Sequence, residues 1–182
     1  MRNSIFVVFF ISISLWELPV FLQTVPEKSK VSFTIKNFGV NTNGTFKAPE
    51  AKVIFDPAAL AKSSIDASID VASVNTGVEG RDNHLRKQEY FYVEKYPKMT
   101  FQSTQIRAGE KSGSYIAHGR LTIRGITKEI DLPFSATTVA DGMRFETQFQ
   151  LDRRQFKVGG NSLVMSDNVN VSIILVTRVL SK

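Results

Sequence analysis

The chain lacks cysteine altogether and has only two histidines and one tryptophan among its 182 residues. Without cysteine there can be no disulfide framework, no thiolate chemistry and no cysteine-ligated metal. The two histidines, His84 and His118, do not have a zinc-binding spacing, so no metal site is expected. Glycine-rich phosphate loops and the Gly-x-Ser-x-Gly nucleophile motif are missing as well. These absences disfavour the common kinds of enzyme.

Long runs of like charge are also missing, although the chain is basic overall. The formal net charge is +6 at pH 7, and the densest basic groups are the pairs Arg86-Lys87 and Arg153-Arg154. Nucleic-acid-binding proteins concentrate positive charge in a patch or carry a recognisable motif, so we expect no nucleic-acid partner. A mildly basic surface is compatible with transient contact with anionic lipid head groups, or simply with exposure to water.

The longest apolar run lies at the N-terminus, from Ile5 to Trp16. Twelve residues suit the apolar core of a secretory signal and are short for a transmembrane helix. We therefore expect a signal peptide at residues 1–23 and an exported domain at residues 24–182. An uncleaved membrane anchor is the alternative, because Val20-Phe21-Leu22 prolongs the apolar stretch.

Beyond residue 30, polar and apolar residues alternate with the period of two that is typical of half-buried β-strands. About eight or nine such segments are expected. Tight turns at Arg124-Gly125 and Asp141-Gly142 predict antiparallel neighbours. One interruption, from Gly80 to about Val93, predicts a short helix with Asp82 as its N-cap. Closure of the sheet would remove exposed edges, which favours an eight-stranded barrel over a sandwich.

An integral outer-membrane barrel would show similar alternation. Such barrels carry girdles of interfacial aromatic residues, whereas the single tryptophan, Trp16, lies in the apolar N-terminal run. Asp66 and Asp70 would face lipid from the same strand if the apolar face lined the lumen. We therefore expect a water-soluble barrel.

Small residues occur among large apolar ones on the face that should point inward. They are Ala67, Ala117, Gly119, Ala136 and Thr147. They are compatible with an interior that is not completely filled, and equally with a packed core in which small and large side chains interdigitate. The pattern does not decide between a cavity and a core.

A polar cluster, Arg81, Asp82 and His84, stands in the expected helix. In one interpretation, His84 or Arg81 hydrogen-bonds a ligand head group while Asp82 orients the basic group. In another, Asp82 caps the helix and Arg81 ties the loop to the barrel rim. A hydrolase that uses His84 and Asp82 as a general base is a third interpretation. The chain offers no nucleophile motif to accompany that pair, so we expect no enzyme activity.

Several motifs in a consistent order resemble the YceI-like family. They are Val31–Lys36 with Gly39-Val40, Gly44–Phe46, Ala72–Gly77 leading into Arg81–Arg86, Tyr96–Thr104, Gly119–Lys128, and Asp152-Arg153 with Phe156. The resemblance implies an all-β, antiparallel, lipocalin-like eight-stranded barrel with a short helical insertion. It further implies a bacterial, periplasmic or secreted protein that holds a polyisoprenoid, such as an isoprenoid quinone, for transport or storage. The sequence departs from the family pattern at Glu89-Tyr90-Phe91 and at Lys157.

The expected ligand is thus a long-chain amphiphile, with a fatty acid or fatty amide as the alternative. No cofactor is required, although a bound isoprenoid lipid or quinone would fit, and a homodimer is compatible with the resemblance. Eleven residues are predicted to contact the ligand: Phe33, Ile35, Phe38, Phe46, Arg81, Asp82, His84, Phe91, Phe101, Phe145 and Phe149.

Overall fold

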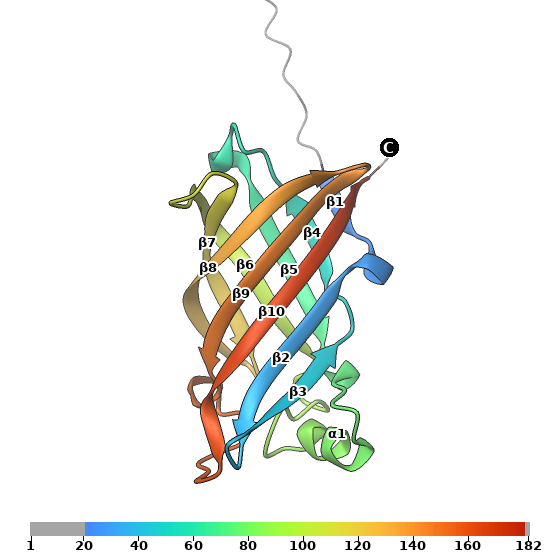
Figure 1. Cartoon of the computed structure of the whole chain (residues 1–182), viewed down its shortest axis with the longest axis vertical. Helices are drawn as coiled ribbons and strands as arrows, with labels where there is room; N and C mark the ends of the chain where they lie inside the picture. Colours follow the sequence, from blue (N-terminus) through green and yellow to red (C-terminus); the bar gives the residue numbers. More distant parts are fainter. Residues whose placement is uncertain (1–20, 181–182) are drawn as a thin grey trace, which may run out of the picture.

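The computed structural model describes residues 21–180, and they form a β-barrel with one short α-helix (Figure 1). The strands are β1 (Phe21–Thr24), β2 (Lys30–Asn37), β3 (Val40–Phe46), β4 (Glu50–Ile54), β5 (Ser64–Asp70), β6 (Lys98–Ala108), β7 (Ser114–Ile123), β8 (Ile126–Val139), β9 (Gly142–Asp152) and β10 (Met165–Val179). The helix is α1 (Glu79–Arg86), and the 3-10 turns are η1 (Pro26–Lys28), η2 (Leu60–Lys62), η3 (Val71–Ser73) and η4 (Arg153–Phe156).

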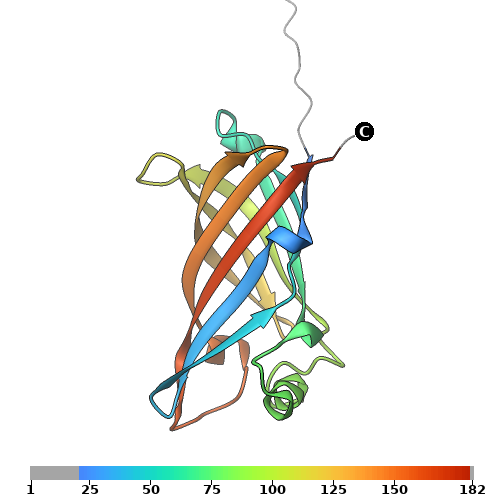
Figure 2. The same cartoon turned by 45° about the vertical axis from the view of Figure 1, so that its right-hand side comes forward.

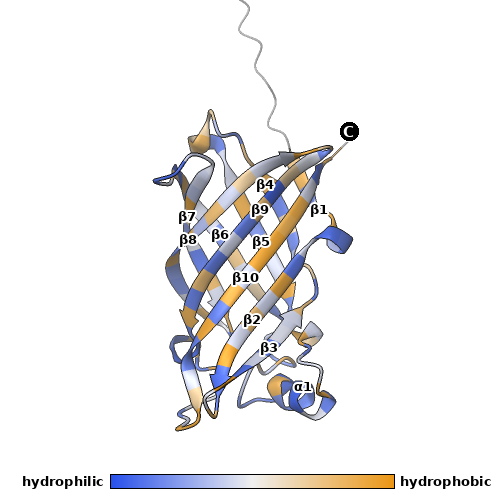
Figure 3. Ribbon diagram, in the orientation of Figure 1, coloured by the Kyte–Doolittle hydropathy of each residue, from blue (hydrophilic) through white to orange (hydrophobic). Residues whose placement is uncertain are grey.

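Eight of the strands close into an antiparallel ring in the order β1-β4-β5-β6-β7-β8-β9-β10, with β1 pairing again with β10. The prediction of an eight-stranded barrel is confirmed. Polar and apolar residues interleave along the strands (Figure 3), so that one face of each strand is turned toward the interior. No helix among residues 21–180 has the length and the apolar character needed to cross a bilayer.

Two strands share one edge of the long strand β10. Leu22 of β1 pairs with Val179 near one end of β10, whereas Asn37 of β2 pairs with Met165 at the other end. Residues 1–20 of the expected signal peptide lie outside the described part of the chain. Its last three residues, 21–23, belong to β1 and therefore to the barrel wall.

The two ends of the barrel are built differently. The ends of the described chain and the turns β4–β5, β6–β7 and β8–β9 lie at the upper end in Figures 1 and 2. The β2–β3 turn, α1 and the loop between η4 and β10 lie at the lower end. There β3 makes one isolated bridge, Thr45 to Asn75, with the segment that follows η3. Residues 71–97, which include α1, thus lie beside the edge of β3, which has no second partner among the described strands.

Aromatic residues fill the upper part of the interior. The ring of Phe55 lies edge-on to Tyr115, Phe134 and Phe145, with centroid separations of 4.9, 5.9 and 5.4 Å. Edge-to-face pairs of this kind are favourable beyond the apolar area that they bury. A second apolar cluster, which includes Val71 and Phe156, lies toward the lower end. Aromatic and apolar side chains therefore close the interior at its upper end.

The helix differs from the predicted one in its start and in its length. It begins at Glu79, three residues before Asp82, and ends at Arg86. Asp82 is not the N-cap, because the preceding loop folds back and Thr76 donates to its carboxylate from both the backbone N–H and the hydroxyl group. Beyond Arg86 the chain continues in turns rather than as a helix to residue 93.

Candidate ligand-binding cavity

A cavity of about 390 Å³ lies inside the barrel below the aromatic cluster. Its walls come from the inward residues of β2, β3 and β5–β10, together with residues of the segment 71–97. Phe134 and Phe145 belong both to the aromatic cluster and to the cavity wall, so they close its upper end. The volume falls within the range of small-molecule binding sites.

Nine of the eleven predicted ligand-contacting residues line this cavity. They are Phe33, Ile35, Phe46, Arg81, His84, Phe91, Phe101, Phe145 and Phe149. Three of the rings form a chain along the wall, since Phe46 lies 5.5 Å from Phe33 and 5.8 Å from Phe91 between ring centroids. The structure therefore brings together residues that are more than a hundred positions apart in the sequence. Whether they contact a ligand stays a prediction.

Two predicted residues do not line the cavity. Phe38 is 75% exposed at the β2–β3 turn, so the expectation that its ring points inward is wrong. The alternation of β2 ends at Asn37, and Phe38 adopts a positive φ of 50° in the turn. Asp82 is buried, but its carboxylate is directed to Thr76. The apolar pattern of a strand does not extend into its turn.

Glycine residues make room for two of the lining rings. A Cβ atom at Gly44 would lie 2.6 Å from Cε1 of Phe33, its partner across β2 and β3. A Cβ atom at Gly119 would lie 2.8 Å from Cζ of Phe101. Both rings can therefore lie against a neighbouring strand instead of extending into the interior. The small residues serve both purposes left open by the sequence: Gly119 packs against a ring, whereas Ala67 lines the cavity.

The polar lining groups from α1 lie at the lower end. Arg81 donates from Nε to Thr76 Oγ1 at 2.7 Å and from Nη2 to the Thr76 carbonyl at 2.9 Å. His84 is exposed, and its ring lies edge-on to Tyr90 at a centroid distance of 4.9 Å. Arg81 thus fastens the loop to the helix, whereas the predicted tie to the barrel rim is not among its hydrogen bonds within residues 21–180. The role of Arg81 and His84 in binding a head group stays a prediction.

The carboxylate of Asp82 helps to fix the same loop. The hydrogen bonds from Thr76, together with the positive charges of Arg86 and Arg81, hold the pKa of Asp82 below its usual value. Asp82 is therefore ionised near neutral pH and accepts from Thr76 rather than from His84. This arrangement gives the hydrolase interpretation no His84–Asp82 dyad.

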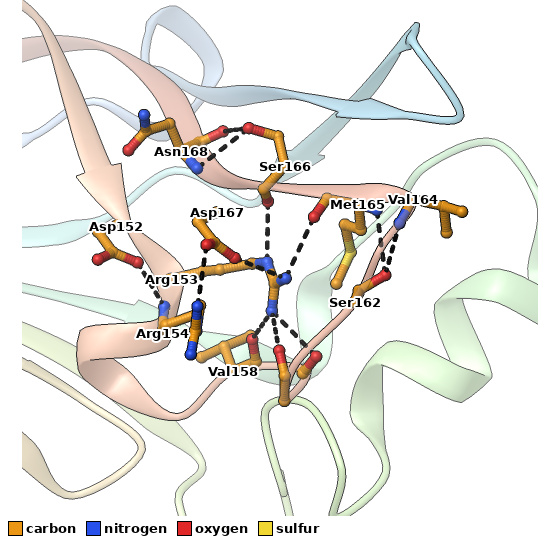
Figure 4. Close-up of polar contacts among 12 residues, drawn as sticks. Asp152, Arg153, Arg154, Val158, Ser162, Val164, Met165, Ser166, Asp167 and Asn168 are labelled. Atoms are coloured by element: carbon orange, nitrogen blue, oxygen red, sulfur yellow. Dashed lines mark hydrogen bonds and ion pairs between the residues drawn. The ribbon is translucent and has the colours of Figure 1, made fainter.

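Arg153 is a lining residue that is not among the eleven predicted ligand contacts. It is 5% exposed, and its guanidinium group donates to six acceptors, three in the loop after η4 and three at the start of β10 (Figure 4). Five acceptors are backbone carbonyls, and the sixth is the carboxylate of Asp167 at 3.1 Å. Its neighbour Arg154 is exposed and also pairs with Asp167. Only its place in the Asp152-Arg153 motif could have distinguished Arg153 from Arg154.

No group of three or more histidine, aspartate or glutamate residues suited to a metal ion occurs within residues 21–180.

Comparisons with known proteins agree with this architecture. A model of the YceI-like domain matches residues 22–177. The crystal structure of Burkholderia cenocepacia BcnA is 30% identical and superposes with a TM-score of 0.79, covering 87% of this chain and 99% of that chain. A Campylobacter jejuni YceI protein is 33% identical with a TM-score of 0.67, covering 79% of this chain and 87% of that one. A Saccharophagus degradans domain described as polyisoprenoid binding shares the fold, with 17% identity, a TM-score of 0.69, and coverage of 90% and 100%.

Among curated sequences, a UPF0312 protein of Photorhabdus laumondii is 38% identical over 104 residues, which are 56% of this chain and 53% of that protein. A UPF0312 protein of Serratia proteamaculans is 36% identical over the same length, with the same coverage. The chain spans about half the length of the curated relatives it matches. The family match covers nearly the entire barrel, and the chain belongs to the YceI-like family.

Proposed function

We propose that this protein binds a long-chain apolar lipid, a polyisoprenoid or an isoprenoid quinone, with its tail in the barrel cavity. The observation that carries the proposal is an apolar cavity closed at one end by Phe134 and Phe145, with Arg81 and His84 among its lining groups at the other. An amphiphile fits this gradient when its tail enters first and its head group stays near Arg81 and His84. The name of the Saccharophagus degradans domain, which shares the fold, points to the same ligand class.

The apolar lining supplies the main favourable free energy for such a ligand. Burial of each methylene-sized group contributes about 0.8 kcal/mol. A dozen buried carbons would therefore contribute about 10 kcal/mol before the costs of immobilising the ligand are subtracted. A micromolar affinity corresponds to about −8 kcal/mol, so the ligand must bury more than a dozen carbons, because association itself costs at least about 4 kcal/mol.

In this proposal the protein acts by holding its ligand and carries out no chemistry. It would be exported to the periplasm or the medium, where an apolar chain needs shelter from water. Transport between membranes and storage are both served by the same reversible binding. No metal or other cofactor takes part.

Native mass spectrometry combined with organic extraction tests the ligand directly. Protein purified from the organism that naturally produces it should carry a discrete lipid adduct that is lost on denaturation. An extracted lipid built of isoprene units would support a polyisoprenoid ligand. An extracted fatty acid or fatty amide would assign the cavity to that class of ligand instead. A clean protein mass and no uptake of quinones, prenyl lipids or fatty amides on titration would overturn lipid binding.

A pair of substitutions on β7 tests the cavity. Leu121 lines it, whereas the neighbouring Arg120 points outward and hydrogen-bonds Gln102. Leu121→Trp should lower ligand affinity at least tenfold because the indole ring occupies the space of the lipid tail. Arg120→Trp adds the same ring to the outer face of the same strand and should leave the affinity unchanged. Equal affinities in the two variants would place the ligand outside the barrel.

A further inference from the structure

Two exposed apolar tips lie side by side at the lower end of the barrel. Phe38 lies in the β2–β3 turn and Val40 follows the turn, whereas Leu163 and Val164 lie in the loop before β10. All four are exposed, and Leu163 is fully so. The N–H of Phe38 donates to the carbonyl of Val164 at 2.8 Å, which joins the two tips, and both project from the same end in Figures 1 and 2.

The tips continue directly from the cavity wall. Asn37 and Met165 both line the cavity and pair with each other across β2 and β10. Phe38 follows Asn37, and Val164 precedes Met165, so each tip begins one residue beyond the lining. The exposed apolar surface therefore lies next to the lower end of the apolar interior.

The turn itself does not call for a phenylalanine. Phe38 and Gly39 have φ angles of 50° and 75°, a conformation for which asparagine and glycine are the favoured residues. A bulky side chain in the left-handed region is unfavourable. The exposed ring of Phe38 thus neither stabilises the turn nor packs in the core, and an apolar environment outside the protein would accommodate it.

Positive groups border a second hollow at the same end. It is lined by Arg124, Arg154 and Lys157 with one acidic residue, Glu89, and by the start of the loop that carries Leu163. Arg124 donates to the carbonyl groups of Gln88 and Lys157, and Arg154 pairs with Asp167 at 3.2 Å. Exposed apolar tips and cations at the same end of the barrel suit interfacial binding to anionic lipid.

We infer that this end of the barrel docks on an anionic lipid bilayer, with Phe38, Val40, Leu163 and Val164 inserted at the head-group boundary. The inference rests on the proposed function for its consequence, the passage of a lipid between bilayer and cavity without crossing water. A bilayer suits two narrow tips better than a protein partner does, because stable protein interfaces are broad and complementary in shape.

Vesicle co-sedimentation of the protein in its exported form tests the docking. The wild type should bind vesicles that contain phosphatidylglycerol more strongly than vesicles of phosphatidylcholine alone, and added salt should weaken this preference. The double variant Phe38→Asn/Leu163→Ser should bind at least tenfold more weakly. Asparagine tolerates a positive φ, so the turn should keep its shape.

A matched control uses the opposite end of the barrel. Leu180 is 48% exposed there, so Leu180→Asn removes an exposed apolar side chain from that end and should bind vesicles like the wild type. Equal vesicle binding by the double variant, or no binding by the wild type, would overturn the docking. If the wild type forms dimers, the double variant does not, and both bind vesicles equally, the tips contact a second copy of the chain. That result would also overturn the docking on a bilayer.

Titration with a short-chain quinone in the absence of vesicles separates docking from ligand binding. The double variant should bind the quinone as the wild type does, because none of the four tip residues lines the cavity. It should, however, take up long-chain quinone from vesicles at least tenfold more slowly. Quinone binding without docking would refute only the inference about the membrane, and docking without uptake of any quinone, prenyl lipid or fatty amide would refute only the proposed function.

Discussion

Arg153 should be the residue on which the loop before β10 depends most. Replacement by lysine keeps the positive charge and much of the length. It reduces the donors from five N–H groups to three. The guanidinium group now serves six acceptors, so Arg153→Lys leaves at least three of them without their present partner. Five acceptors are carbonyls gathered around one nearly buried side chain, and a single ammonium group cannot reach all of them.

The expected loss of stability follows from these contacts. A hydrogen bond contributes about 1 kcal/mol net, and more when the donor is charged. Loss of three or more bonds should therefore lower the free energy of unfolding by about 3 kcal/mol, with water in the exposed parts of the loop limiting the loss. The nearby Arg154→Lys change should cost less than about 1 kcal/mol, because the Arg154–Asp167 pair is exposed.

Urea denaturation followed by far-UV circular dichroism measures both values, and amide hydrogen exchange locates the effect. Exchange should quicken at Val158 and Met165 in Arg153→Lys and stay unchanged in Arg154→Lys. A difference of less than about 0.5 kcal/mol between the two variants would mean that the six contacts do not stabilise the loop in solution.

Three further changes probe the lower end and the cavity. Gly44→Ala should push the Phe33 ring into the cavity, at a cost of about 1–3 kcal/mol in unfolding free energy and with weaker lipid uptake in a titration. Lys157→Gly should raise the melting temperature by about 2–4 °C. The φ of 54° is unfavourable for lysine by up to about 1 kcal/mol, and glycine adopts it without that strain. Asp82→Asn should be less stable than the wild type at pH 7 in urea denaturation. That difference should shrink as the pH falls below 3.8, since the lowered pKa of Asp82 stabilises the fold only while its carboxylate is ionised and accepts from Thr76.

Each of these changes has a control or a contrary outcome. Gly80 has open space around its Cβ position and no positive φ, so Gly80→Ala should not destabilise the protein. If Gly44→Ala behaves in the same way, the Phe33 ring does not lie on Gly44. A lower melting temperature for Lys157→Gly would show that the lysine side chain contributes more than its backbone strain costs. A stability difference for Asp82→Asn that stays constant down to pH 2 would exclude the proposed role of its charge.

The barrel was predictable from the sequence because strand alternation depends on local residues. The alternation from Ile65 correctly indicates the half-buried strand β5, although its last residue, Val71, begins η3 instead. Residues 21–24 cannot be recognised as a strand from the sequence, because they continue an apolar run. Only their pairing with both β4 and β10 identifies them as a strand. Helix position was less accessible, because the donors that satisfy Asp82 come from a loop whose path is set by tertiary contacts.

The cavity was only partly predictable for a related reason. Inward positions follow from alternation, which correctly indicates Phe33 and Phe101. Free space between them depends on which residue lies across the sheet, and the pairing of Phe33 with Gly44 is a matter of register. Phe38 shows the opposite case, because one residue beyond the end of a strand the alternation no longer applies.

Because Phe134 and Phe145 close one end of the cavity, the depth of the cavity limits the length of ligand tail that it can bury. The tail of a ligand can advance only until it meets Phe134 and Phe145, so each added isoprene unit should improve binding up to that depth and contribute little beyond it. Longer homologues would leave their surplus chain at the mouth and gain no affinity. The length at which affinity stops rising would then measure the depth of the barrel, and Phe134→Ala, which moves the stop upward, should shift it toward longer chains.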